Sequence, residues 1–243
     1  YKTIWMRTLK VSLMVTIFCL ILAYPVSYLL ATLPMRTSNL LMICVLMPFW
    51  TSLLVRIVAW MIMLQQNGVV NDTMLTVLPC IFEGPINLPF FGETNIDLCF
   101  SDEDRIPMMY NFTGTIIVMT QVLLPFMILP LYANMEKLDH TIHEAAADLG
   151  ARPFTTFFTV TLPLTTPGIM AGSLLVFIPA TGEFVIPDLL GGGNVLMIGR
   201  VLYNEFNANH DWPVASAVAI VLLLVLVIPM ILYPRNQSKE NNG

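Results

Sequence analysis

Residues 139–163 read DHTIHEAAADLGARPFTTFFTVTLP and form a polar interval between two strongly apolar segments. Apolar residues recur at helical spacing on one face of its first half: Leu138, Ile142, Ala145 and Leu149. Gly150 stands where that helix would end in a left-handed residue, and Pro153 suits the first turn of a second short helix. The second helix would carry three phenylalanines on one side: Phe154, Phe157 and Phe158. The interval therefore predicts a helix–turn–helix outside the bilayer, packed either on the chain's own membrane domain or in a groove of a soluble partner.

The composition is that of a membrane protein. Of the 243 residues, 56% are hydrophobic and 11% are charged, whereas soluble proteins average about 45–50% and about 25%. Five stretches reach the roughly 20 apolar residues that cross a bilayer: about 11–33, 40–64, 112–135, 164–186 and 213–233. The expected fold is an all-α polytopic transmembrane helix bundle, with one domain over 1–235 and a polar tail over 236–243. The net charge of −5 argues against nucleic-acid binding.

The polar interval also resembles a known motif. Glu144-Ala145-Ala146 is followed after three residues by Gly150 and, after nine more, by Val160-Thr161-Leu162-Pro163. This order resembles the EAA loop of bacterial ABC importer permeases, with Val160 in place of the usual Ile. The resemblance implies a type I permease fold in which loop 136–163 is cytoplasmic and couples to a separate ATPase. The implied coupling residues are Glu144, Ala145, Ala146, Gly150, Leu162 and Pro163.

Further blocks resemble the permeases of spermidine/putrescine importers and are closest to the putrescine branch: residues 48–56, 124–132, 182–192, 198–200 and 211–213. The resemblance implies a multi-pass protein of the bacterial inner membrane. That family usually has six spans, so the first is expected to be missing here. The implied partners are an ATPase dimer, a second permease subunit, a periplasmic polyamine-binding protein and membrane lipid. Alternative functions are an ABC permease for another small solute, or a self-contained secondary transporter or channel.

A cytoplasmic loop 136–163 sets the orientation of the other segments. Loop 65–111, which is rich in Asp and Glu, is then outside, as the positive-inside rule favours. Five spans put the N-terminus outside, although Lys2, Arg7 and Lys10 lie there. Cys80 and Cys99 both fall in the outer loop, where they either form a disulfide in an oxidising periplasm or remain free thiols. Cys19 and Cys44 lie within spans and are expected to be packing residues.

The chain shows no sign of catalytic or nucleotide chemistry of its own. It contains no G-x-x-x-x-G-K-[ST] phosphate-binding loop, so no cofactor is expected on this chain and ATP with Mg²⁺ is assigned to the partner ATPase. His140 and His143 flank the EAA motif, but position 147 is Ala, so H-E-x-x-H is absent and no metal site is expected. We therefore expect a transport subunit that is not an enzyme.

A polyamine cargo requires carboxylates for its ammonium groups and aromatic faces for cation–π contact. Glu183 is a carboxylate well within an apolar span, so it is expected to face the translocation path. The alternative is a structural partner for Arg56 or for a backbone group. Asp188 is either a second anchor or a surface residue at a helix end.

Aromatic residues complete the candidate pathway. Trp50, beside Pro48 in mid-span, is expected in the lumen, with the interfacial aromatic belt as the alternative. Tyr132 either lines the path or packs in the core. Trp60 is expected in the interfacial aromatic belt. Arg56 is expected off the path, paired with a carboxylate. Asp211-Trp212 either contacts the binding protein or caps a helix.

Overall fold

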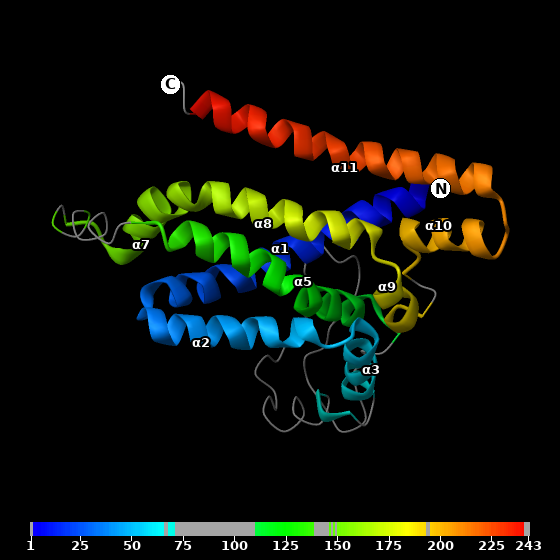
Figure 1. Cartoon of the computed structure of the whole chain (residues 1–243), viewed down its shortest axis with the longest axis horizontal. Coiled ribbons are helices and arrows are strands. Elements are labelled where there is room, and N and C mark those ends of the chain that lie inside the picture. Colours follow the sequence, from blue (N-terminus) through cyan, green and yellow to red (C-terminus); the bar gives the residue numbers. More distant parts are fainter. Residues whose placement is uncertain are drawn as a thin grey trace, which may run out of the picture.

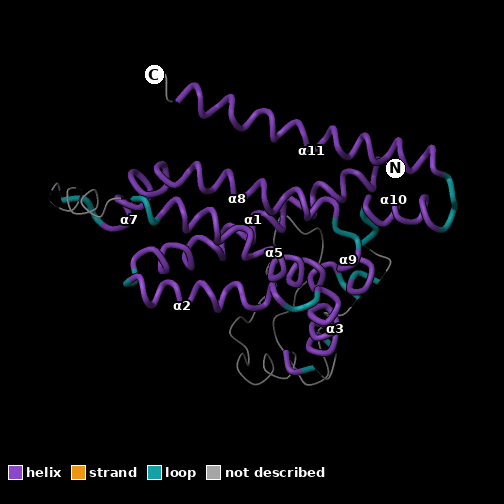
Figure 2. Tube along the Cα trace, in the orientation of Figure 1, coloured by secondary structure: helices purple, strands orange, loops and turns teal. Residues whose placement is uncertain are grey.

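The chain folds almost entirely into helices (Figures 1 and 2). The computed structural model describes residues 2–65, 68–70, 110–138, 146, 148, 150–192 and 195–240. Their helices are α1 (Lys2–Thr32), α2 (Met35–Leu46), the 3₁₀ turn η1 (Met47–Trp50), α3 (Leu53–Leu64), α5 (Phe112–Met135), α7 (Pro153–Thr156), the π-helical segment η2 (Phe157–Thr161), α8 (Leu162–Gly182), α9 (Val185–Leu190), α10 (Ile198–Asn207) and α11 (Trp212–Glu240). No strand occurs among these residues, and the predicted all-α class is confirmed.

The core is formed by α1, α5 and α8, which pack against one another. Small side chains form a buried stripe along α1: Thr8, Ser12, Thr16, Cys19, Ala23 and Ser27. Such residues let membrane helices approach closely. The thiol of Cys19 and the hydroxyl of Ser27 accordingly reach the carbonyls of Thr120 and Ile128 on α5, each at 3.4 Å. Cys19 is thus a packing residue as expected, whereas Cys44 on α2 is exposed.

The described residues contain three helical stretches long and apolar enough to cross a bilayer: Lys2–Thr32, Phe112–Met135 and Phe157–Gly182. A fourth results if Met35–Trp50 and Leu53–Leu64 are counted as one span with a bend of 93°. The apolar part of α11, Trp212–Val227, is shorter. The five predicted spans thus coincide with helices, but the second is sharply divided and the helix of the fifth continues through the expected tail to Glu240.

The division of the second span occurs at Pro48, within η1. A carbonyl left without an intrahelical donor is costly in apolar surroundings. Arg56 supplies donors at this point, because its guanidinium binds the carbonyl of Pro48 and lies 3.3 Å from that of Thr51. Among the described residues the partners of Arg56 are therefore carbonyls, and not the carboxylate that was expected. The bend itself creates the acceptors that hold this side chain.

The helix α8 runs without interruption through two prolines and two glycines. It passes Pro167, Gly168, Gly172 and Pro179 and ends at Gly182. Membrane helices tolerate such residues when neighbouring groups satisfy the backbone. The actual break lies at Glu183 and Phe184, between α8 and α9.

The two ends of the bundle carry different elements (Figure 1). The helix α1 begins near α10, α7 lies at the opposite end, and α11 runs back toward the end that carries α7. The N-terminal segment and the candidate coupling loop are therefore at opposite ends, as the predicted topology requires. Residues 2–10, which carry the three N-terminal basic side chains, belong to α1 itself.

Candidate coupling loop and cargo pathway

Gly150 adopts the left-handed conformation predicted for it, with φ of +79°. The N–H of Ala151 donates to the carbonyl of Ala146, five residues back, at 3.0 Å. This is the 6→1 hydrogen bond of a Schellman motif, which ends a helix at a left-handed glycine. The remaining members of the EAA triplet, Glu144 and Ala145, lie outside the described residues, as do His140 and His143.

The second half of the loop is not a separate helix. Pro153 does begin α7, as predicted, but α7 continues through the π-helical segment η2 directly into α8. Leu162 is half-buried and Pro163 is exposed in the first turn of α8. Phe157 and Phe158 also do not share one side. Phe157 is half-buried, whereas Phe158 is 62% exposed, because consecutive helical residues point in different directions.

Phe157 links this loop to the core of the membrane domain. Its ring packs edge-to-face on Tyr24 of α1, with the ring centroids 5.3 Å apart. The hydroxyl of Tyr24 lies 3.1 Å from that of Thr165 on α8. The end of the coupling loop is thereby held by two of the three core helices. Single-turn π segments occur frequently at functional sites.

Glu183 occupies the break between α8 and α9. Its Oε1 accepts the backbone N–H of Val185 at 3.0 Å and that of Ile186 at 3.3 Å. A side-chain oxygen placed in this way caps the start of a helix. Of the alternatives considered for Glu183, a backbone partner is therefore present, and a pairing with Arg56 is not. The side chain is half-buried, and a role in the translocation path stays a prediction.

Asp188 is an exposed residue of α9 and forms an ion pair with Arg200 of α10, and its role as a second anchor stays a prediction. Arg200 is additionally held by Asn204, whose side-chain oxygen lies 3.2 Å from Nε. Beside this pair the rings of Phe184 and Tyr203 are stacked, with centroids 5.0 Å apart and planes inclined by 21°. The sequence reading included neither Arg200 nor Tyr203 among the candidate residues. The sequence feature that could have identified them is their spacing of three residues on an amphipathic helix.

The contacts of Trp50 and Tyr132 do not involve Glu183. Trp50 is 85% exposed in η1. Tyr132 is half-buried against the core and accepts a hydrogen bond from Ser38 of α2 at 3.1 Å. Cavities of about 270 and 370 Å³ among the described residues are lined by none of the predicted pathway residues. A shared path for these residues stays a prediction.

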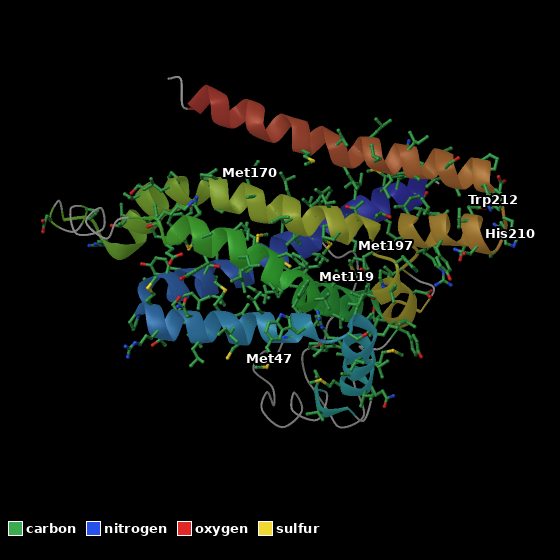
Figure 3. The ribbon with its side chains drawn as sticks, in the orientation of Figure 1. Met47, Met119, Met170, Met197, His210 and Trp212 are labelled. Carbon is green, nitrogen blue, oxygen red and sulfur yellow. The ribbon has the colours of Figure 1, made fainter. Side chains whose placement is uncertain are left out.

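The structure also describes Trp60, Asp211 and Trp212. Trp60 is half-buried and donates to Gln121 of α5 at 3.2 Å, and its place in the aromatic belt stays a prediction. Asp211 caps α11, since its Oδ1 lies 3.3 Å from the N–H of Val214. Trp212 is 62% exposed at the turn from α10, close to His210 (Figure 3). Cys80, Cys99 and most of loop 65–111 lie outside the described residues, so the disulfide stays a prediction.

Comparison with known proteins identifies the class. Residues 22–237 match the family described as binding-protein-dependent transport system inner membrane component. The chain belongs to this family. It is 37% identical to the spermidine/putrescine transport system permease protein PotB of Escherichia coli, over 97% of this chain and 78% of that protein. It is 39% identical to PotB of Haemophilus influenzae, over 99% and 76%.

A solved structure supports the fold. The crystal structure of a bacterial alginate ABC transporter, in complex with alginate pentasaccharide-bound periplasmic protein, superposes with a TM-score of 0.65. The match covers 95% of this chain and 75% of the other at 15% identity, so it bears on the fold alone. The predicted type I permease fold and inner-membrane location are confirmed. The relatives' name includes both polyamines, so the narrower assignment to putrescine stays a prediction.

Proposed function

We propose that this chain is the membrane-spanning permease subunit of an ATP-driven importer that moves spermidine, putrescine or both from periplasm to cytoplasm. The observation that carries the proposal is the 37% identity to PotB along 97% of the chain. The proposed assembly comprises an ATPase dimer, a second permease subunit and a periplasmic polyamine-binding protein. ATP with Mg²⁺ belongs to the ATPase, since this chain contains no phosphate-binding loop.

The continuity of α7, η2 and α8 supports a mechanism for coupling. Closure of the ATPase dimer pushes on loop 136–163, and the displacement reaches α8 through an uninterrupted helical run. The contact of Phe157 with Tyr24 carries the same displacement to α1. Rocking of α1 and α8 together changes access at the far end of α8, where Glu183 lies. Lid and domain motions of this kind set the rate of many proteins that cycle between states.

The cargo assignment rests on charge. Ammonium groups bind best to ionised carboxylates and to aromatic faces. The break after α8 supplies Glu183, Phe184 and Asp188 within six residues. Trp50 and Tyr132 are proposed to line other parts of the path. Because none of these side chains lines the two cavities described above, the second permease subunit is proposed to supply the opposite wall of the path.

Reconstitution in liposomes tests the proposal. The chain is combined with its ATPase, the second permease subunit and the binding protein, and uptake of radiolabelled putrescine and spermidine is measured with and without ATP. We expect uptake that requires ATP and all components. Uptake by the chain alone, without nucleotide, would instead establish a secondary transporter or channel. ATP-dependent uptake of another solute, with neither polyamine transported, would overturn the cargo assignment.

A further inference from the structure

The helices α9 and α10 face each other through two matched contacts. Phe184 and Asp188 are four residues apart, so they lie on one face of α9 and its cap. Arg200 and Tyr203 are three apart on α10 and share a face in the same way. The two rings stack with centroids 5.0 Å apart, and the two charges form an ion pair. The same two helices therefore bring together a paired carboxylate and two stacked aromatic rings, which are the kinds of group that bind an ammonium group.

A second cation can replace Arg200 as the partner of Asp188. The side chains of Arg200 and Asp188 remain 32% and 39% exposed, and an ion pair in contact with water is weak. Arg200 has a second partner in Asn204, so it does not lose all its hydrogen bonds when it leaves Asp188. The stretch 183–212 contains four carboxylates and a single Lys or Arg, Arg200. The surroundings therefore favour entry of a second cation.

We propose that Arg200 is a specificity-determining residue that occupies Asp188 in the cargo-free permease and is displaced by an ammonium group of a diamine. This inference rests on the proposed polyamine function. A cargo held at Glu183 by one ammonium group presents its second group to Asp188 at high effective concentration. A monoamine has no such tether and competes poorly with Arg200, which is itself tethered. The pair thus selects diamines and polyamines over monoamines.

Equilibrium binding to the purified complex of ATPase and permease subunits, without the binding protein, tests the inference. The probes are radiolabelled putrescine and, as competitor, butylamine. Arg200→Gln removes the internal competitor, so we expect putrescine to bind about three- to tenfold more tightly and butylamine to compete better. Asp188→Asn removes the anchor and should weaken putrescine binding by a similar factor. Arg200→Lys and Asp188→Glu keep both charges and serve as controls.

A purely structural ion pair makes the opposite prediction. Either single substitution would then break the same contact, so both would shift putrescine affinity in the same direction or leave it unchanged. The double variant Asp188→Arg/Arg200→Asp, which exchanges the two charges, would then restore the wild-type affinity for putrescine. Either result overturns the inference. The inference requires shifts of opposite sign and no restoration by the exchange. Thermal unfolding of each variant separates these effects from misfolding.

A measurement on the unaltered complex needs no variant. Phenylglyoxal modifies free guanidinium groups, and mass spectrometry of the peptide that contains Arg200 gives its rate of modification. We expect putrescine to increase this rate by releasing Arg200, and butylamine at the same concentration to have little effect. An unchanged or decreased rate with putrescine would overturn the inference. If the complete wild-type transporter imports polyamines while these tests fail, the results exclude only the proposed role of Arg200. If the transporter imports no polyamine, they exclude the proposed function itself.

Discussion

Gly168 of α8 lies directly against Asn134 of α5: a Cβ built on Gly168 would come within 2.8 Å of the Asn134 Cβ and 3.2 Å of the Pro130 carbonyl. Gly172, one turn further along, lies equally close to Met127. The two glycines form a G-x-x-x-G pattern, in which the absence of side chains lets membrane helices approach. Two of the core helices are therefore held together by residues that have no side chain.

The Gly168 contact predicts a loss of stability on adding a methyl group. Gly168→Ala should lower the free energy of unfolding by about 1–3 kcal/mol, because the neighbouring atoms are backbone and Cβ and yield little. Gly182→Ala is a matched control, since a Cβ there would meet nothing within 4 Å. Thermal unfolding in detergent, followed by circular dichroism, checks the pair. Equal melting temperatures for the two variants would contradict the close approach of α5 and α8.

Arg56 predicts a second effect on stability. Arg56→Met removes the donors to the carbonyls of Pro48 and Thr51 at the bend between α2 and α3. The Pro48 residue is half-buried and Thr51 is exposed, and because a bilayer offers no replacement donors, leaving their carbonyls unpaired there costs about 1–3 kcal/mol. Arg36→Met, at an exposed arginine of α2, should change the unfolding free energy by less than about 0.5 kcal/mol. Chemical unfolding in detergent compares the two, and a larger effect at Arg36 would rule out the proposed role of Arg56.

The sequence predicted the membrane class and the approximate spans, because hydropathy measures how many apolar residues follow one another. It did not predict which face of each helix is buried. In a bilayer both the lipid-facing and the core-facing sides are apolar, so periodicity is weak. The informative signal was side-chain size. The buried stripe from Thr8 to Ser27 on α1 and the glycines of α8 are visible in the sequence, but they were treated as parts of two apolar runs.

The candidate site was predictable only where it depends on local geometry. Gly150 is left-handed as expected, because its conformation is fixed by the helix that ends there. The bonds of Glu183 to Val185 and Ile186 are also local and match a helix cap. In contrast, the partner of Asp188 lies twelve residues away across a connection between two helices. The acceptors of Arg56 exist only because α2 and α3 meet at 93°. Neither can be read from spacing alone.

Gly150 predicts an effect on coupling that depends on backbone conformation alone. A Cβ at this position would meet nothing within 4 Å, so Gly150→Ala adds only the cost of a left-handed alanine, about 1–2 kcal/mol. Asn tolerates this conformation, whereas a β-branched residue does not. We therefore expect the ratio of putrescine transported to ATP hydrolysed to fall in the order Asn, Ala, Val in the reconstituted transporter. A Val variant that couples as well as the Asn variant would show that the turn does not transmit the movement.

Glu183 allows its two roles, helix cap and cargo ligand, to be separated. In Glu183→Gln the amide oxygen can still accept the N–H groups of Val185 and Ile186, so α9 keeps its cap while the charge is lost. We expect unfolding within about 0.5 kcal/mol of the wild type, together with about tenfold weaker putrescine binding. Glu183→Ala loses the cap as well and should be about 1 kcal/mol less stable. Equilibrium dialysis with radiolabelled putrescine and thermal unfolding measure the two properties. If Glu183→Gln binds putrescine as the wild type does while Glu183→Ala is destabilised, Glu183 is a helix cap and the cargo path lies elsewhere.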